Sequence, residues 1–385
     1  MLRHAREWIV SPRGVKAWSR FLPGLHRRLD RPQLSDLTQV RRLGVLRPDG
    51  IGDMVLTSGM LRELRRQLPA TRITLICQTP WASWMRTCPW VDDVVDVEMT
   101  SGGVREPRRL FELLRFVKRV WPLELEVLIQ PGTVYWYAPS RALAWFSGAP
   151  VRVCWEDPDA GVDTGSELHT HNLPYPNCLH ETEKCFRMLE VIGLKGEARR
   201  LDTWWTSEDA SHGDEIVRDA RKGRRKLVAL GLAASEPPRR WPPERYLDVI
   251  REVAAQRDVA FLALGGTDVV DSCRWLSAQA PGVVTYPGDR LPLGVIWAAI
   301  AQCDLYLGND SGLMHMAAAA RISVVVVNGL ADEARPGTRG DTPQTGPYDT
   351  LSRVVRPPAG TPPDTELNTA LVTADAVATA TMELL

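Results

Sequence analysis

The sequence lacks a net charge of one sign, because its 47 Lys and Arg residues balance its 47 Asp and Glu residues. This balance removes the usual electrostatic argument for a nucleic-acid-binding protein. The seven cysteines are odd in number and form no Cys-x-x-Cys pair, so they predict reduced thiols rather than disulfides. No apolar run of about 18 residues and no signal-peptide pattern are present, so we expect a cytoplasmic chain without a membrane span.

Two common catalytic motifs are also absent. Without Gly-x-Ser-x-Gly the sequence does not support a hydrolase with a nucleophile elbow. Without Gly-x-x-x-x-Gly-Lys followed by Ser or Thr it does not support a P-loop kinase. The 44% apolar and 24% charged residues are an ordinary balance for a globular protein. The chain of 385 residues is long enough for two domains.

The first 42 residues differ from the rest. They carry ten Arg and Lys residues among the aromatic side chains Trp8, Trp18 and Phe21, and prolines divide them into short pieces. A basic segment with aromatic residues can attach to an anionic membrane surface. The alternative is a solvated arm that packs its tryptophans on the domain behind it.

Beyond this arm, short apolar strands alternate with amphipathic helices in two series, which begin near Leu43 and Lys226. Such alternation predicts an α/β fold with parallel, doubly wound sheets. We therefore expect two Rossmann-like domains that face each other across a cleft. Residues 156–182 and 329–363 are polar or rich in Pro and Gly and are predicted to be loops. The predicted organisation is an arm at 1–42, an N-terminal domain at 43–202, a linker at 203–225, a C-terminal domain at 226–371 and a final helix at 372–385.

Three loops follow predicted strands, where ligands of open parallel sheets bind. In the first, which spans residues 47–53, Gly50 and Gly52 allow a sharp turn and Asp53 stands at the start of the next helix. Asp is also a preferred N-cap residue, so a purely structural role for Asp53 is an alternative. A Gly-x-Gly pair without a third glycine is weak evidence for a dinucleotide site.

The second loop contains Ser235 and, four residues later, the adjacent Arg239 and Arg240. A hydroxyl, free backbone N–H groups and guanidinium groups suit a pyrophosphate. The alternative is a solvated basic turn.

The third loop places Asp310, Ser311 and Gly312 at a helix N-terminus, with His315 one turn later on the same face as Ser311. This arrangement also suits an anion, and the alternative is a capped core helix with a satisfied histidine. A His/Cys group elsewhere has no standard zinc-ligand spacing, so no metal site is predicted. Its members are His169, His171, Cys178, His180 and Cys185.

Together these motifs resemble glycosyltransferase family 9, the heptosyltransferases of lipopolysaccharide inner-core synthesis. Three segments carry the resemblance: Ile51 to Thr57 with the following Leu68-Pro69, Arg239 to Pro242, and Asn309 to His315 with its alanine run. The C-terminal Val372 to Val377 is similar as well. The resemblance spans about Leu43 to Leu385 in the order and spacing of these segments.

The resemblance implies a GT-B fold and an inverting, metal-independent transfer from a nucleotide sugar, typically ADP-heptose. It assigns the acceptor to the N-terminal domain and the donor to the C-terminal domain. Asp53 matches the family's catalytic aspartate, and Arg239 stands where the family usually has a phosphate-binding lysine, which is not a neutral exchange. The donor-binding residues implied in this way are Ser235, Arg239, Arg240, Asp268, Gly288, Asp310, Ser311, Gly312 and His315.

The sequence thus predicts a heptosyltransferase that needs no cofactor beyond its donor substrate and acts on a glycan or lipid-linked acceptor. Peripheral contact with the inner face of the cell membrane through residues 1–42 is part of this expectation. Two alternatives remain open from the sequence. One is a nucleotide-sugar-binding protein without turnover, and the other is a GT-B-like nucleotide-sugar epimerase.

Overall fold

The computed structural model describes residues 39–98, 107–132, 137–156, 168–176, 179–196, 199–330, 342–362 and 368–385. The predicted membrane contact of the basic arm falls almost wholly on residues outside these ranges. The described residues divide into two compact units. The first runs to Arg199, and the second comprises Arg200–Leu385 with the short segment that ends at His180.

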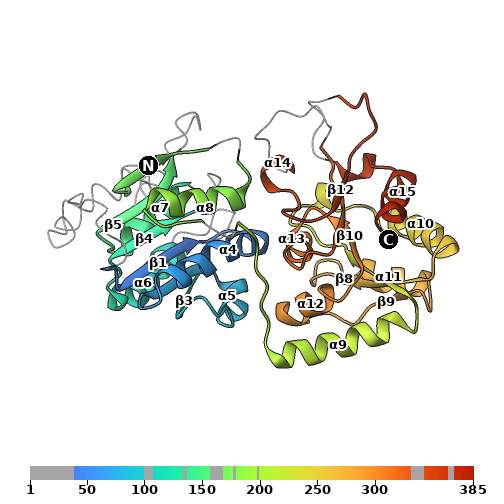
Figure 1. The fold of residues 1–385 in the computed structure, drawn as a ribbon, viewed down its shortest axis with the longest axis horizontal. Helices are drawn as coiled ribbons and strands as arrows, with labels where there is room; N and C mark the ends of the chain where they lie inside the picture. The colour runs from blue at the N-terminus through green and yellow to red at the C-terminus, as the bar shows by residue number, and fades with distance from the viewer. Residues whose placement is uncertain are drawn as a thin grey trace. The chain divides into compact units, whose positions relative to one another are not determined.

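The first unit is built on a six-stranded parallel sheet in the order β3-β2-β1-β4-β5-β6 (Figure 1). Its strands are β1 (Arg42–Arg47), β2 (Arg72–Gln78), β3 (Asp93–Val97), β4 (Val127–Gln130), β5 (Val151–Glu156) and β6 (His171–Pro174). Its helices are α4 (Ile51–Gln67), α5 (Thr79–Met85), α6 (Pro107–Val120), η2 (Trp121–Leu123), α7 (Tyr137–Phe146) and α8 (Glu181–Val191).

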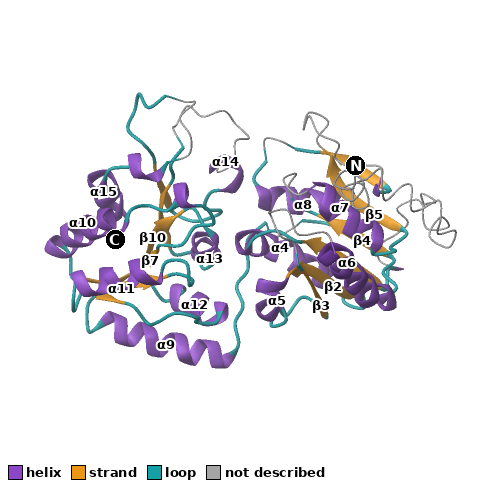
Figure 2. Cartoon of the chain, turned by 180° about the vertical axis from the view of Figure 1, so that it is seen from behind, coloured by secondary structure: helices purple, strands orange, loops and turns teal. Residues whose placement is uncertain are grey.

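The second unit repeats this plan with a parallel sheet in the order β12-β11-β10-β7-β8-β9 (Figure 2). Its strands are β7 (Lys226–Gly231), β8 (Val259–Leu264), β9 (Val284–Thr285), β10 (Leu305–Asn309), β11 (Ser323–Val327) and β12 (Ser352–Val355). Its helices are α9 (Ser207–Arg221), η5 (Pro237–Arg239), α10 (Pro243–Gln256), α11 (Val270–Gln279), α12 (Leu293–Ile300), α13 (Gly312–Ala319), α14 (Thr342–Thr345), η6 (Thr369–Leu371) and α15 (Ala374–Leu384).

Both sheets have the doubly wound strand order, in which the direction of strand addition reverses once. The reversal lies between β1 and β4 in the first unit and between β7 and β10 in the second. Loops that leave the carboxyl ends of these strands diverge and expose a crevice for ligands. The predicted α/β class is therefore confirmed, and the topology identifies one candidate binding position in each unit.

The structure has two edge strands and the start of one helix in stretches that the sequence predicted to be loops. The predicted loop 156–182 contains β6, and the predicted surface stretch 329–363 contains β12. Both strands pair only on one side and carry polar residues, so neither has the apolar run of a central strand. Helix α8 begins at Glu181, at the end of the same predicted loop.

The predicted linker 203–225 holds helix α9, which packs against α12 and β8 of the second unit. The helix begins where Thr206 accepts a hydrogen bond from Asp209 N–H and the Asp209 carboxylate accepts one from Thr206 N–H. This reciprocal pair satisfies two donors at the helix start. Gly213 faces α12, because a Cβ there would lie 3.0 Å from Ala298 Cβ. A single narrow apolar stripe is thus enough to hold a mostly charged helix.

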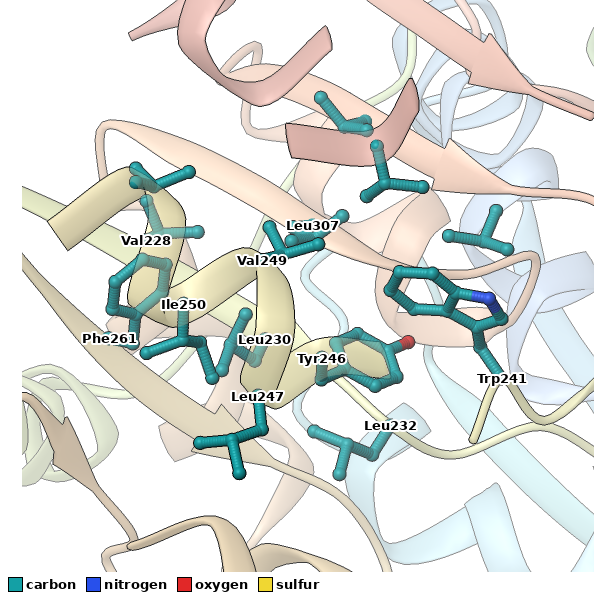
Figure 3. Packing of buried hydrophobic residues seen from close by; sticks show 14 of the residues in the cluster. Val228, Leu230, Leu232, Trp241, Tyr246, Leu247, Val249, Ile250, Phe261 and Leu307 are labelled. Atoms are coloured by element: carbon teal, nitrogen blue, oxygen red, sulfur yellow. The ribbon is translucent and has the colours of Figure 1, made fainter. Parts of the chain in front are cut away.

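The core of the second unit lies between its sheet and helix α10. Val228 and Leu230 of β7 and Phe261 of β8 meet Val249 and Ile250 of the helix (Figure 3). Each side chain is nearly fully buried, and burying one such side chain stabilises the fold by about 1.5–3 kcal/mol. This core fixes the carboxyl end of β7, from which the candidate loop with Arg239 and Arg240 leaves, and that of β8, which is followed by the loop that carries Asp268.

All six cysteines among the described residues are free and buried. In the part of the chain that the structure describes, every helix is too short or too polar to cross a membrane.

Candidate functional site

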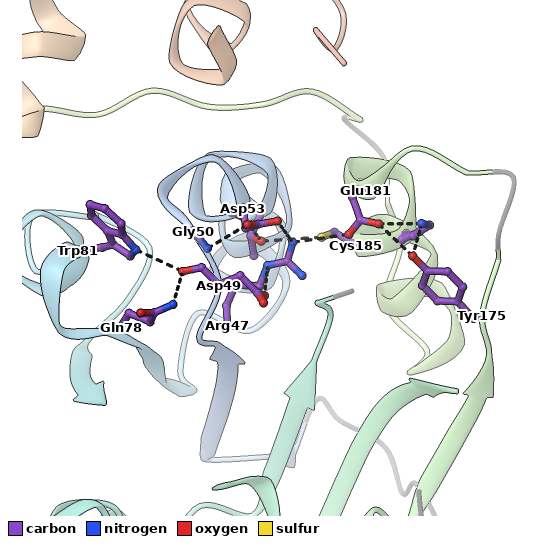
Figure 4. Close-up of polar contacts among 11 residues, drawn as sticks. Arg47, Asp49, Gly50, Asp53, Gln78, Trp81, Tyr175, Glu181 and Cys185 are labelled. Carbon is purple, nitrogen blue, oxygen red and sulfur yellow. Dashed lines mark hydrogen bonds and ion pairs between the residues drawn. The ribbon is translucent and has the colours of Figure 1, made fainter. Parts of the chain in front are cut away.

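Asp53 is the third residue of α4, immediately after the loop that leaves β1 (Figure 4). Its Oδ2 accepts a hydrogen bond of 3.0 Å from Gly50 N–H, and Thr57 Oγ1 donates to its main-chain carbonyl at 2.7 Å. Asp53 therefore lies in the first turn of the helix rather than at the N-cap, which Gly50 occupies. Its side chain keeps about 30% of its surface exposed, so one side of the carboxylate faces outward.

Arg47, the last residue of β1, is fully buried and lies among three carboxylates (Figure 4). Its Nη2 is 3.1 Å from Asp53 Oδ1 and 3.6 Å from Glu181 Oε2, and its Nε is 3.3 Å from Asp49 Oδ2. Burial acts to lower the pKa of Arg47, but the surrounding carboxylates outweigh it and raise that pKa above its ordinary value. The guanidinium therefore stays charged and compensates anions that would be costly to bury alone.

Glu181 connects this arginine to a second buried cation. Its Oε1 accepts a hydrogen bond of 2.7 Å from Lys184 Nζ one turn later in α8. Lys184 also donates to Tyr175 Oη at 2.5 Å and lies 4.2 Å from the centre of that ring. We call Arg47, Asp49, Asp53, Glu181 and Lys184 the Arg47 cluster. Its three carboxylates and two cations give a formal charge of −1 if every group is ionised.

Gly132 lies beside the Arg47 cluster, two residues after β4. A Cβ at this position would be 2.6 Å from both Arg47 Nη1 and Asp49 Oδ2, which is closer than packed atoms approach. The Arg47 cluster thus sits at the reversal between β1 and β4, with the loop after β4 pressed onto it. A side chain at position 132 would displace the guanidinium or the carboxylate.

Asp49 is a buried member of the Arg47 cluster whose carboxyl group resists ionisation. Its carbonyl accepts hydrogen bonds from Gln78 Nε2 and Trp81 Nε1, which hold the loop against β2 and α5. Burial raises the pKa of Asp49 to about 7; the guanidinium of Arg47 opposes this, and the carboxylates of Asp53 and Glu181 add to it. A proton on Asp49 would bring the charge of the Arg47 cluster to zero.

We expect Asp49→Asn, which mimics the protonated side chain, to change the pH dependence of stability. The folded-state pKa lies above the unfolded value, so the wild type loses this contribution as the pH rises from about 4 through 7. The melting temperature of the variant relative to wild type should therefore be higher at pH 8 than at pH 5, by on the order of several °C. Calorimetry at both pH values checks this, and an unchanged difference would contradict it.

In the second unit, Asn309 at the end of β10 joins the loop after β7 to the sheet. Its Nδ2 donates to Leu232 O at 2.7 Å, and its Oδ1 accepts from Trp241 N–H at 3.0 Å and from Tyr246 Oη at 3.1 Å. The side chain is fully buried, so these bonds form away from solvent. Asn309 thereby fixes the loop that carries both predicted arginines.

Arg239 and Arg240 each pair with an aspartate from another loop. Arg239 Nη2 is 2.5 Å from Asp310 Oδ2, and Arg240 Nη2 is 2.9 Å from Asp268 Oδ2. Arg240 Nε also donates to Ala234 O at 3.0 Å. The structure therefore brings the loops after β7, β8 and β10 together through charged contacts, and an anionic ligand here would meet arginines that already have carboxylate partners.

Helix α13 begins beside the Arg239–Asp310 pair. Ser311 occupies its N-cap, Gly312 is its first residue, and the main-chain N–H groups of Met314 and His315 bond back to Ser311 O. His315 is buried one turn into the helix. The first N–H groups of a helix carry partial positive charge and favour an anion.

Two glycines bring β7 and β10 close together at this position. A Cβ on Gly231 would lie 1.9 Å from Tyr306 Oη, and one on Gly308 would lie 2.5 Å from Gly231 O. Burial raises the pKa of Tyr306 well above its ordinary value, so its hydroxyl stays protonated. The neutral hydroxyl of Tyr306 therefore lies against the main chain of β7 and β10, where the strand order reverses.

Three further residues predicted to bind the donor are Ser235, Asp268 and Gly288. Ser235 is exposed on the loop after β7, and Asp268 is about 40% exposed while it contacts Arg240. Gly288 follows β9, at the edge of the sheet, with a positive φ of 113°. Within the described residues, no hydrogen bond or ion pair links Gly288 to the arginines.

The comparison with known families decides between the open interpretations. The model of glycosyltransferase family 9 (heptosyltransferase) matches residues 138–359. The chain belongs to glycosyltransferase family 9. It is therefore a glycosyltransferase, as the motifs predicted, rather than a binding protein without turnover or an epimerase.

Curated relatives of this family 9 protein are distant in sequence. The lipooligosaccharide heptosyltransferase 2 of Haemophilus ducreyi is 21% identical over 293 residues, which cover 71% of this chain and 79% of the relative. The enzyme of the same name from Haemophilus influenzae is 19% identical over 293 residues, which cover 74% of this chain and 82% of the relative.

Solved structures place the family 9 chain in the GT-B fold. A glycosyltransferase family 9 protein from Veillonella parvula superimposes with a TM-score of 0.72 at 18% identity, covering 91% of this chain and 99% of that one. ADP-heptose LPS heptosyltransferase II of E. coli gives a TM-score of 0.67 at 16% identity, covering 89% and 98%. The predicted GT-B architecture is thus confirmed.

The described members of the His/Cys group of this family 9 chain have separate surroundings. His169 is buried, which lowers its pKa well below the ordinary value. His180 stacks on Tyr348, and Cys185 lies 4.0 Å from Thr57 Oγ1 beneath Asp53. Cys178 lies outside the described residues. Among those that are described, no three His, Cys, Asp or Glu residues are grouped as metal ligands.

Sequence reasoning missed Arg47, Asp49, Glu181 and Asn309 as individual site residues. Arg47 and Asn309 share a signal that could have found them, since each is a polar residue that ends a strand with an apolar interior. A buried polar residue needs a partner, so such a residue points to a network. Glu181 gives no such signal, because it begins a helix after a polar loop.

Proposed function

We propose that this glycosyltransferase transfers a heptose from ADP-heptose to a sugar hydroxyl of a lipooligosaccharide-type acceptor, with inversion at C1 and without a metal ion. The match to a heptosyltransferase family model carries the proposal. The names of its curated relatives support a lipooligosaccharide acceptor, and E. coli heptosyltransferase WaaC, solved with ADP, supports the adenine nucleotide.

The reaction needs a base for the acceptor hydroxyl, and Asp53 is the group proposed for it. As the acceptor oxygen attacks C1, its proton moves to the Asp53 carboxylate and the bond from C1 to the diphosphate oxygen breaks. Arg47 and Gly50 each donate a hydrogen bond to one carboxylate oxygen of Asp53. The exposed part of the side chain is where the acceptor hydroxyl approaches in this proposal. A positioned general base contributes about 10²–10⁴-fold to such a step.

The leaving ADP needs positive groups, and the second unit provides them at the reversal of its sheet. Arg239 lies on the loop after β7, and the first N–H groups of α13 follow the end of β10. Asn309 accepts a hydrogen bond from Trp241 N–H, and Asp310 forms an ion pair with Arg239, so the two segments are held together. A guanidinium and a helix N-terminus can stabilise a departing diphosphate without an ion. The other implied donor residues, Ser235, Arg240, Asp268, Gly288, Ser311, Gly312 and His315, remain part of this proposal.

We also propose a cytoplasmic location with peripheral attachment to anionic lipid through residues 1–42. Ten basic residues and interspersed tryptophans support this, because each basic residue near an anionic surface contributes about 1 kcal/mol. Such attachment would concentrate the enzyme where a lipid-linked acceptor is found.

The proposed reaction is tested by incubating the protein with ADP-heptose and a lipooligosaccharide acceptor in the presence of EDTA. We expect acceptor-dependent ADP release and an acceptor that is heavier by one heptose, with a rate within about twofold of that without EDTA. UDP- and GDP-linked sugars serve as donor controls. Loss of activity on chelation that a divalent metal restores would contradict the metal-independent mechanism.

A further inference from the structure

Arg47 contacts Asp53 but is itself inaccessible. Its side chain has no exposed surface, whereas that of Asp53 is about 30% exposed. An acceptor hydroxyl can therefore reach Asp53 but not the guanidinium behind it. Any contribution of Arg47 to transfer must act through another residue.

The orientation of Asp53 is fixed at both carboxylate oxygens. Arg47 Nη2 donates to Oδ1 at 3.1 Å, and Gly50 N–H donates to Oδ2 at 3.0 Å. Two donors on different oxygens restrict rotation of the carboxylate, which a single helix-start contact would leave freer. Because one donor is a buried cation, the contact is a charge-assisted hydrogen bond, which is stronger than a neutral one.

The guanidinium is in turn held from its other side. Glu181 Oε2 lies 3.6 Å from Nη2, Asp49 Oδ2 lies 3.3 Å from Nε, and Gly132 leaves no space for a side chain beside Nη1. Lys184 balances the charge of Glu181. Arg47 cannot move without disrupting contacts with α8 and with the loop after β4, so its position is well determined.

We propose that Arg47 is the positioning residue for Asp53: the buried guanidinium, held by Glu181 and Asp49, fixes the carboxylate in one orientation toward the acceptor hydroxyl. The inference rests on the proposed function of Asp53 as the base. It adds that the base is effective only while the charge and the planar donor geometry of Arg47 are present. The charged or titratable groups around this pair are Asp49, Glu181, Lys184 and Cys185.

The test compares Arg47→Gln and Arg47→Lys with the wild type. Arg47→Gln should lower kcat by between about tenfold and 10²-fold, because a misplaced base loses alignment, while the donor KM stays unchanged. Arg72→Gln, which breaks the exposed pair with Asp93, is the matched control and should behave as wild type.

Arg47→Lys separates charge from geometry. It keeps the positive charge, but the ammonium cannot reproduce the planar donors, so kcat should still fall. If Arg47→Gln fails to fold, as judged by loss of a cooperative thermal unfolding transition, this variant decides the question. A lysine variant with wild-type kcat would overturn the proposal.

A double-mutant cycle distinguishes this inference from the proposed function. In an Asp53→Asn background, Arg47→Lys should cause no further loss of kcat, because the residue it positions is already disabled. An equal loss in both backgrounds would overturn the positioning role. A wild type that transfers no heptose, or an Asp53→Asn variant with full activity, would instead contradict the proposed function.

Discussion

Replacing Asp53 with asparagine is expected to lower kcat for heptosyl transfer by about 10²–10⁴-fold, the range that a general base contributes. Asparagine has nearly the same shape and can still accept the hydrogen bond from Gly50 N–H. Its amide cannot take up the proton of the acceptor hydroxyl. Binding of ADP should persist, because the residues proposed for it lie in the other unit. Steady-state ADP release, with ADP affinity measured by calorimetry, checks both parts.

Two other aspartates serve as comparisons for this variant. Asp93→Asn changes a partly exposed carboxylate that pairs with Arg72 and should leave kcat unchanged. Asp49→Asn alters a buried neighbour of Arg47 and should cost much less than Asp53→Asn, because Asp49 is almost fully buried. If Asp53→Asn kept more than about a tenth of the wild-type kcat, Asp53 would not be the base.

Arg239→Ala is expected to weaken ADP binding by about tenfold or more, because a charged hydrogen bond is worth about 1.5–3 kcal/mol. The structure adds a second reason, since Asp310 would lose its partner 2.5 Å away and its carboxylate would repel the diphosphate. Adenosine, which has no phosphate, should bind almost as tightly as to wild type. Calorimetric titration with both ligands checks the difference.

A matched control and a rescue sharpen this prediction. Arg245→Ala removes an exposed arginine from the first turn of α10 and should leave both affinities unchanged. Adding Asp310→Asn to Arg239→Ala should recover part of the ADP affinity, because the repelling charge is gone. Equal losses for ADP and adenosine would show that Arg239 does not act on the diphosphate, and would make Arg240 the next residue to test.

The sequence predicted the central strands because they are apolar runs bounded by turn residues. It missed β6 and β12, since edge strands are buried less and can be polar. It missed α9, whose apolar stripe is narrow and whose surface is charged. In each case tertiary contacts, not local pattern, determine the structure.

The candidate site was predictable at the level of loops but not of partners. Asp53, Arg239 and Asp310 all lie at strand ends, where parallel topology places ligands. That Arg47 is buried against Glu181, or that Arg239 pairs with Asp310, depends on contacts between residues far apart in the chain. The pairing changes the chemistry, because arginines expected to be free for a ligand already have carboxylate partners.

The anomeric configuration of the product tests the proposed mechanism most directly. Wild-type protein would be incubated with ADP-heptose and a lipooligosaccharide acceptor in EDTA, and the new glycosidic linkage assigned by nuclear magnetic resonance. Direct attack of the acceptor hydroxyl on C1, with Asp53 as the base, predicts a configuration opposite to that of the donor. Retention of the donor configuration would require a second displacement and would contradict this account.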